Sequence, residues 1–104
     1  MESAGDRPLD QIRKRFAERC RSDLGRLTAL RASGAYRGDA EAMSSLLGIA
    51  HSLAGTGGTL GFPEISSTAF EVETMLIEGK IDDQATAALD RLIGALAVVS
   101  DGPK

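Results

Sequence analysis

Four stretches of the chain each repeat an apolar residue every three or four positions, and this period limits the possible folds more than any other feature. Such spacing places the apolar side chains on one face of an α-helix, whereas a half-buried strand needs strict alternation. Gly, Pro and Asp residues separate the four stretches. The pattern therefore predicts four amphipathic helices, over residues 8–33, 39–60, 63–78 and 82–100.

Each predicted helix carries its own stripe of expected core residues. The four stripes are Leu9, Ile12, Phe16, Cys20, Leu24, Leu27 and Leu30; Met43, Leu46, Leu47, Ala50, Leu53 and Ala54; Ile65, Ala69, Val72 and Leu76; and Ile81, Ala85, Leu89, Leu92, Leu96 and Val99. Aromatic residues make up only 4% of the chain, so the core must be aliphatic, and the scattered β-branched residues exclude an all-β fold. Because short connections make successive helices antiparallel neighbours, we expect an all-α fold: an antiparallel up-down-up-down four-helix bundle, as one domain over residues 1–104.

Residues at the ends of the predicted helices support this division. Asp39 suits the N-cap of the second helix, and Asp82 or Asp83 suits that of the fourth. Gly34 and Gly79 suit the position just past a helix C-terminus, where the backbone often turns left-handed. The expected connections are therefore short turns rather than long loops.

Single occurrences of Cys and His exclude several classes of protein. A disulfide framework, a zinc knuckle or a metal site made by one copy of the chain needs several such residues. No apolar run approaches the roughly 18–20 residues of a membrane span, and residues 1–9 do not resemble an export signal. We expect no metal, no membrane association and a cytoplasmic protein.

Charge is distributed unevenly along the chain. The formal charge is +4 up to Arg37 and −7 from Gly38 onwards, for a net charge of −3. The basic residues follow the first predicted helix without interleaved aromatic residues, so we do not expect nucleic-acid binding. A solvated charged face of that helix is the simpler interpretation.

His51 is expected to project from an unusually bare face of the second helix. At about 100° per residue it lies at the rim of that helix's apolar stripe, open to solvent. Its neighbours on this side are all small: Ser44, Gly48, Gly55 and Gly58. A face cleared of side chains around a histidine predicts that a large partner docks there.

The glycines in this helix need an explanation, because each interior Gly costs about 0.8–1.0 kcal/mol relative to Ala. One alternative is close contact with another helix, which suits Gly57, and another is that residues 55–61 form a loop. A phosphate-binding loop is excluded, because Leu60 stands where the dinucleotide motif needs Gly and the Gly-Lys pair of a P-loop is absent.

The segment His51-Ser52-Leu53-Ala54-Gly55, followed by Gly61-Phe62, resembles the signature of histidine-containing phosphotransfer (Hpt) domains, including that of chemotaxis histidine kinases. That signature is His, any residue, an aliphatic residue, usually Lys, then Gly, with another Gly after several small residues. The resemblance implies a helical bundle whose histidine accepts a phosphoryl group on Nε2 and exchanges it with an aspartate of a response-regulator receiver domain. It also implies a histidine kinase or hybrid kinase as partner, and no cofactor except the Mg²⁺ that the receiver supplies.

The chemistry of a lone histidine agrees with this role. Neutral imidazole is a good nucleophile near pH 7, and an exposed ring can enter another protein's pocket. Phosphoryl transfer through a loose transition state mainly needs positioning and charge neutralisation, both of which a partner can provide. The sequence shows no ATP site, so whether the chain is itself an enzyme stays open.

The third predicted helix offers supporting residues on the flank of its core stripe. Ser66, Phe70, Glu73 and Ile77 share this flank. In the chemotaxis kinases a glutamate 22 residues after the histidine hydrogen-bonds the ring, and Glu73 stands at that interval from His51. We therefore expect Phe70 and Ile77 to help dock a partner and Glu73 to orient the ring. The alternative is an ordinary exposed glutamate, because the two flanks converge for only one handedness of the bundle.

Ala54 departs from the family pattern, because it stands where a lysine usually helps to hold the phosphate. An arginine of the basic first helix, such as Arg21 or Arg26, is a candidate replacement. Cys20 lies on an apolar stripe and is expected to be a small core residue without chemistry.

A second function remains open beside phosphotransfer. A non-catalytic helical adaptor, or pseudo-phosphotransfer domain, would bind a signalling partner through the Gly-rich face, with His51 incidental. The chain can equally be a free phosphocarrier or a domain of a larger kinase.

Overall fold

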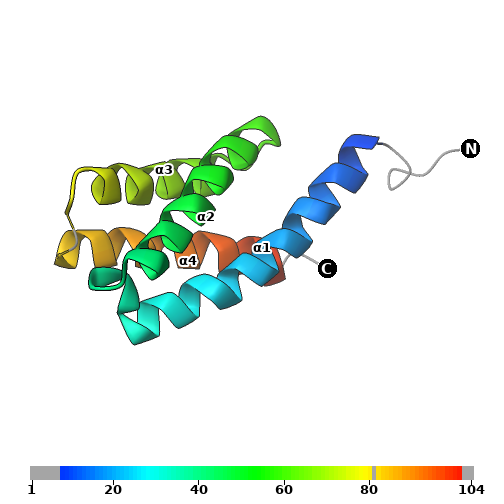
Figure 1. Cartoon of the computed structure of the whole chain (residues 1–104). Helices are drawn as coiled ribbons and strands as arrows, with labels where there is room; N and C mark the ends of the chain where they lie inside the picture. The colour runs from blue at the N-terminus through cyan, green and yellow to red at the C-terminus, as the bar shows by residue number, and fades with distance from the viewer. Residues whose placement is uncertain (1–7, 81, 102–104) are drawn as a thin grey trace, which may run out of the picture.

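The computed structural model describes residues 8–80 and 82–101, and the regular structure in this part of the chain is helical throughout. The α-helices are α1 (Pro8–Ser33), α2 (Ala40–Thr59), α3 (Pro63–Ile77) and α4 (Asp83–Asp101), as Figure 1 shows. A short 3₁₀ helix, η2 (Ala35–Arg37), lies in the connection after α1. The predicted all-α class is confirmed, and no predicted helix end differs by more than one residue.

Helix ends form as the sequence predicts. The Asp39 carboxylate accepts a hydrogen bond from the backbone N–H of Glu41 at 3.0 Å, and Asp82 accepts one from that of Gln84 at 3.0 Å. Each bond satisfies an N–H group that the first turn of a helix leaves without a partner. Gly34 and Gly79 have φ angles of 67° and 78°, so both turns use the left-handed conformation that glycine adopts without strain.

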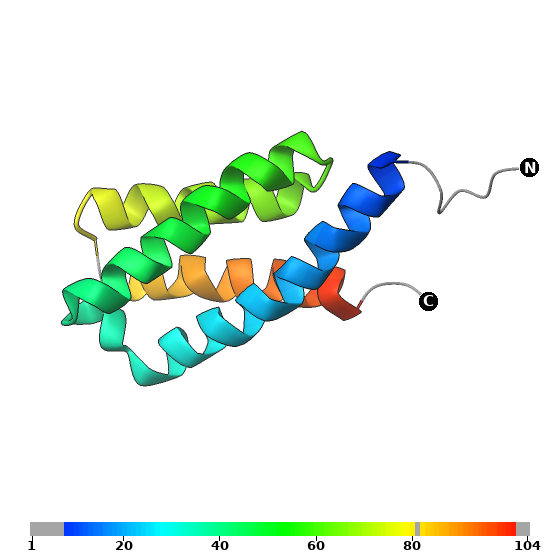
Figure 2. The same cartoon turned by 45° about the vertical axis from the view of Figure 1, so that its right-hand side comes forward.

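The helices pack in pairs (Figures 1 and 2). Helices α2 and α3 lie side by side, while α4 packs against both α1 and α3. The connection between α2 and α3 lies at the end of the molecule opposite η2. This arrangement leaves one long face of the α2–α3 pair open.

Aliphatic side chains fill the core, as predicted. The largest side chains with almost no exposure are Leu27, Leu46, Leu53, Ile65, Leu89, Leu92 and Leu96. The Phe16 and Phe62 rings pack with their centroids 5.1 Å apart. The side chain of Leu9 and residue Ile81, both expected in the core, lie outside the described residues.

One expected core residue is wrong. Ile12 belongs to the apolar stripe of α1 but is 46% exposed. Its side chain lines an open hollow between α1 and the C-terminal half of α2, so that α2 faces it without covering it. None of the described helices is both long enough and apolar enough to cross a membrane.

Candidate functional site

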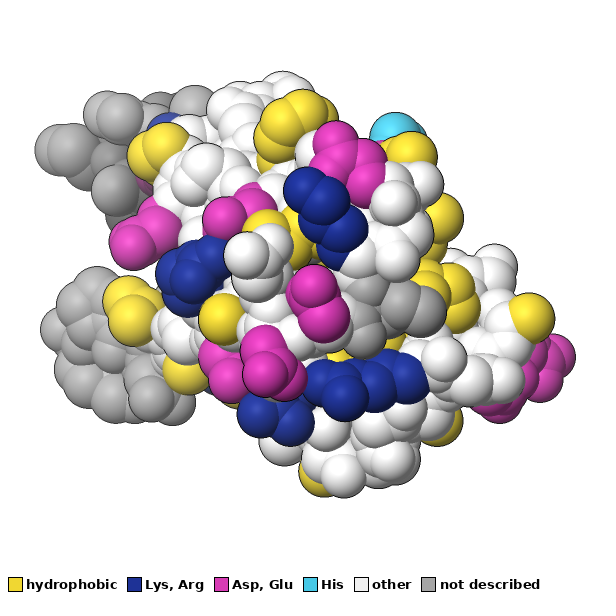
Figure 3. Space-filling view, turned by 90° about the vertical axis from the view of Figure 1, so that its left-hand side faces the viewer, with side chains coloured by type: hydrophobic (Ala, Val, Ile, Leu, Met, Phe, Trp, Pro, Cys, Tyr) yellow, Lys and Arg dark blue, Asp and Glu magenta, His cyan; other side chains and the backbone are white. Residues whose placement is uncertain are grey.

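His51 stands on the exposed side of α2, where its helical position predicts it. Its side chain is 76% exposed, whereas its neighbour Ala50 is fully buried in the core. In Figure 3 the single histidine, coloured cyan, stands at the edge of the molecular outline. The ring is therefore open to a partner protein.

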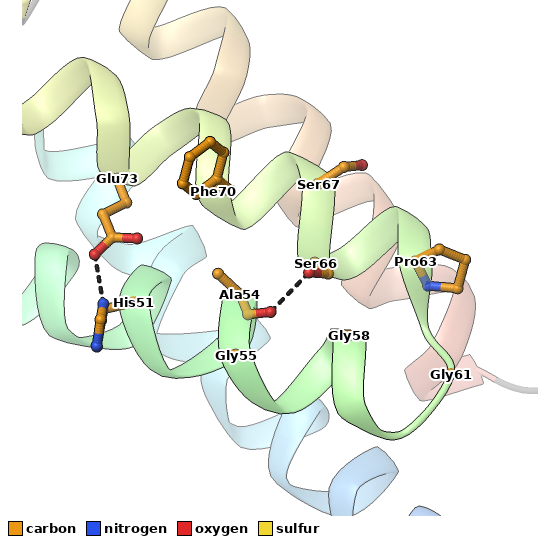
Figure 4. Close-up of a pocket in the computed structure, with 10 residues that line it drawn as sticks. All are labelled: His51, Ala54, Gly55, Gly58, Gly61, Pro63, Ser66, Ser67, Phe70 and Glu73. Atoms are coloured by element: carbon orange, nitrogen blue, oxygen red, sulfur yellow. Dashed lines mark hydrogen bonds and ion pairs between the residues drawn. The ribbon is translucent and has the colours of Figure 1, made fainter.

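Glu73 of α3 contacts the inner nitrogen of this ring. His51 Nδ1 lies 2.5 Å from Glu73 Oε2, and the glutamate side chain is only 14% exposed. A carboxylate at this position accepts a hydrogen bond from Nδ1–H, and in the neutral ring that tautomer has its lone pair on Nε2. Figure 4 shows the second ring nitrogen directed away from Glu73.

Close packing of α2 against α3 fixes this pair. A Cβ atom added at Gly57 would lie 3.3 Å from Ile65 Cγ2 and from the Ser66 backbone nitrogen, so a larger residue would push the helices apart. The Ser66 hydroxyl donates a hydrogen bond to the Ala54 carbonyl at 2.7 Å, which ties the helices together (Figure 4). The interpretation of Gly57 as a close helix contact is confirmed, and the alternative of a loop over residues 55–61 is wrong, because α2 continues to Thr59.

An open groove of about 780 Å³ runs between α2 and α3 beside the histidine. We call it the α2–α3 groove, and Figure 4 shows its lining: His51, Ala54, Gly55, Gly58, Gly61, Pro63, Ser66, Ser67, Phe70 and Glu73. Of the predicted docking residues, Gly55, Gly58 and Phe70 therefore lie together with the histidine. Phe70 is 62% exposed, and a Cβ atom at Gly55 would meet nothing within 4 Å, so both positions are open to a partner. Ile77 is exposed one turn beyond Glu73, but it does not line the groove.

Ser44 and Gly48 lie elsewhere. Both line a separate hollow between α1 and α2, together with Arg19, Asp23 and Arg26. The sequence groups them with Gly55 because all share one side of α2. The structure divides that side, because α3 packs along one edge of it and α1 along the other.

A family comparison adds to this geometry. The family model described as Hpt domain matches residues 11–101 of the chain. The chain belongs to the Hpt domain family. Neither a curated protein nor a solved structure matches the chain significantly. Hpt domains carry out histidine phosphotransfer in phosphorelay signalling and work with kinases and receiver domains.

Neither of the two arginines named from the sequence contacts His51 in this Hpt domain. Arg21 donates to the Ser100 carbonyl near the end of α4, and Arg26 pairs with Asp23. A third arginine of α1, Arg19, lies near: its Nη2 donates to the hydroxyl of Ser52, the residue after His51, at 2.6 Å. No sequence signal distinguishes it from the other arginines of α1, because the contact depends on how α1 is rotated against α2.

Cys20 fits the prediction of a core residue in this Hpt domain. Its side chain is fully buried in α1. Burial, with a smaller contribution from the nearby Asp23 carboxylate, raises the pKa of the thiol to about 11. Because the reactive thiolate is therefore scarce near pH 7, Cys20 has no nucleophilic role in the site.

Proposed function

We propose that His51 accepts a phosphoryl group on Nε2 and exchanges it with the phospho-accepting aspartate of a response-regulator receiver domain. The observation that carries this proposal is the pairing of an exposed His51 with Glu73 at the α2–α3 groove. The pairing leaves Nε2 unprotonated and directed toward solvent, which is the state that attack on phosphorus requires.

The transfer step moves no proton, so it needs no acid or base from the receiver. The Nε2 lone pair forms the N–P bond while the P–O bond of the receiver's aspartyl phosphate breaks, and the aspartate keeps that bonding pair. The imidazole becomes a cation that still carries the Nδ1 proton. The Glu73 carboxylate at 2.5 Å from Nδ1 stabilises this cation, and the reverse reaction follows the same path.

Charge on the transferred group is the main electrostatic difficulty. Phosphoryl transfer depends on positioning and on neutralising the phosphoryl oxygens, and divalent metal ions commonly provide that neutralisation. We propose that the receiver brings Mg²⁺ into the complex and that this Hpt domain contributes the oriented imidazole. A histidine kinase or hybrid kinase then stands on the other side of the relay.

The docking surface follows from the small residues around the ring. Gly55 and Gly58 add no side chain to the groove beside His51, which leaves room for a partner. The exposed Phe70 ring, which also lines the groove, offers an apolar anchor. Ser44 and Gly48, on the α1 side of α2, and Ile77, beyond Glu73, form the outer part of the proposed contact area. We infer an antiparallel up-down-up-down order for the bundle, which keeps α2 and α3 adjacent along this surface.

A transfer assay tests the proposal. The protein is incubated with receiver domains phosphorylated on aspartate, and we expect acid-labile, base-stable phosphate to appear on it. His51→Gln should abolish this labelling while the thermal unfolding temperature stays nearly unchanged, because an exposed side chain contributes little to packing. Labelling that persists in His51→Gln would remove this residue from the mechanism. A partner that binds wild type and His51→Gln equally, with no labelling of either, would favour the adaptor function.

A further inference from the structure

The surroundings of His51 lack a positive charge for a bound phosphoryl group. Two hollows flank the ring, the α2–α3 groove and a second one that runs from Ile12 to the end of α2. The described residues that line these two hollows include one carboxylate, that of Glu73, and no lysine or arginine. A phosphoryl group adds about two further negative charges near neutral pH. Any cation of this chain that stabilises the phosphoryl group must therefore come from outside the described lining of these two hollows.

A cluster with surplus positive charge lies on α1, on the other side of α2. Asp23 is nearly buried, and two arginines share its carboxylate: Arg19 Nε at 3.2 Å from Oδ2 and Arg26 Nη1 at 3.8 Å from Oδ1. One arginine is enough to neutralise one carboxylate. Both guanidinium groups are partly exposed, with side-chain exposures of 40% and 57%. The cluster therefore keeps one positive charge that can be shared with an anion.

Arg19 brings this charge to the neighbour of the histidine. Its Nη2 hydrogen-bonds the Ser52 hydroxyl at 2.6 Å, on the flank of α2 that faces α1. Glu73 holds Nδ1 from the opposite flank, so the free ring nitrogen is directed away from α3 (Figure 4). The contact of Arg26 with α2 is to Ser45, six residues before His51 and so about 9 Å away along the helix axis. Arg19 is thus the better placed of the two arginines.

We propose that Arg19 supplies the cation that holds the phosphoryl group of phospho-His51, while Arg26 continues to neutralise Asp23. The inference rests on the proposed function, because it concerns the phosphorylated form of His51. Rotation of the outer torsions of Arg19 moves its N–H donors from Ser52 to the phosphoryl oxygens, and no covalent bond changes. A guanidinium suits this role, because its planar donors match phosphate oxygens in pairs. Arg19 takes the role of the lysine that Ala54 replaces, but from the opposite flank of α2.

The experiment compares the lifetime of phospho-His51 in Arg19→Gln and in the matched control Arg21→Gln, which removes the same charge from α1 but at a residue that contacts the Ser100 carbonyl rather than Asp23 or Ser52. The full chain is phosphorylated by an aspartyl-phosphate receiver domain, the receiver is removed, and the loss of the phosphohistidine signal is followed by ³¹P NMR. We expect Arg19→Gln to shorten the lifetime about three- to fivefold at low salt, in the range of a partly exposed ion pair, and Arg21→Gln to leave it unchanged. The difference should shrink in about 1 M salt, where charges on the surface are screened.

A second measurement separates a direct contact from a structural role. On phosphorylation of the wild type, the Arg19 Nε–Hε signal in a ¹H–¹⁵N NMR spectrum should shift and that of Arg26 should not. Arg19→Lys should recover part of the lifetime, since it restores the charge without the planar donors. The shift of the Arg19 signal is measured on the wild type, so it does not depend on whether any variant folds.

Different negative results would contradict different claims, either the proposed function of His51 or the role of Arg19. If the wild type takes up no phosphate on His51, the proposed function fails before the role of Arg19 is reached. If His51 is phosphorylated but Arg19→Gln decays like the wild type, or the Arg19 signal does not move, the role of Arg19 is overturned and the proposed function stands. Equal shortening in both glutamine variants would also overturn it, because it would indicate a general effect of net charge.

Discussion

The two flanks of α2 differ in packing and in charge. On the α3 side the helices are in close contact at Gly57, the Ser66 hydroxyl bonds the Ala54 carbonyl, and a carboxylate faces the ring. On the α1 side a polar hollow separates the helices, and the long side chain of Arg19 spans it to reach Ser52. His51 stands between these two flanks.

Under the proposed function, this difference lets one helix serve two requirements of phosphotransfer. Orienting a ring requires a partner held in place by close packing, which the α3 flank provides. Neutralising a phosphoryl group that is present only while His51 is phosphorylated requires a side chain that is free to move, which an open polar flank allows. A second close-packed helix on the α1 side would immobilise the arginine and cover the histidine.

The largest expected effect separates two glycines of α2. Gly57→Leu should lower the free energy of unfolding by about 1–3 kcal/mol, because its side chain must displace Ile65 and the α3 backbone. Gly55→Leu should leave that free energy unchanged or slightly higher, since a Cβ atom there meets nothing within 4 Å and leucine favours helix. Urea unfolding of the two variants, followed by circular dichroism, measures both.

The Gly55→Leu variant also tests the proposed docking surface. Gly55→Leu should weaken binding of a receiver domain at least about tenfold, because the new side chain stands beside His51 where a partner must approach. Titration calorimetry with the folded variant measures this affinity. Unchanged affinity and transfer rate would mean that the bare face is not where the receiver docks.

A smaller effect is expected at the carboxylate of the α3 flank. Glu73→Ala should slow phosphoryl acceptance about tenfold and let the His51 proton redistribute between its two nitrogens, which ¹⁵N NMR of the ring detects. Glu73→Gln keeps an acceptor for Nδ1–H without the charge, so its rate should fall between those of alanine and wild type. Glu71→Ala is the matched control, because Glu71 pairs with Arg91 rather than His51. Identical rates in all four proteins would show that Glu73 does not assist the transfer.

The smallest effect concerns Ala54, which lines the α3 flank of the groove. If Arg19 already supplies the cation, Ala54→Lys should change the lifetime of phospho-His51 less than about twofold in the wild type, yet restore most of it in Arg19→Gln. Ala54→Met, which has a similar stem without charge, should restore nothing. A severalfold longer lifetime for Ala54→Lys alone would indicate that the native site lacks a cation, contrary to the role inferred for Arg19. Phosphohistidine decay followed by ³¹P NMR gives all of these lifetimes.

Sequence periodicity was a reliable guide within each helix. The spacing of apolar residues predicted the helix bounds to within one residue and placed Ala50 and Leu53 in the core, with His51 exposed beside them. Turn and cap residues performed equally well, because Asp39 and Gly34 act through their own backbone neighbourhood. The same reasoning fails at Ile12, where the apolar stripe faces an open hollow beside α2 rather than a close-packed helix.

What the sequence determined by itself is the position of each residue around its own helix axis, because the α-helical period is a property of the local backbone. The sequence therefore places Phe70, Glu73 and Ile77 on one flank of α3, but it does not determine which residues that flank contacts. Only the tertiary structure decided that Glu73 contacts His51 and that Ser44 and Gly48 lie in a different hollow. It also decided that Arg19, rather than Arg21 or Arg26, reaches the neighbour of the histidine. The physical reason is that contacts between helices depend on their relative rotation and on the direction in which the chain turns, and these follow from the packing of the whole core rather than from any one stripe.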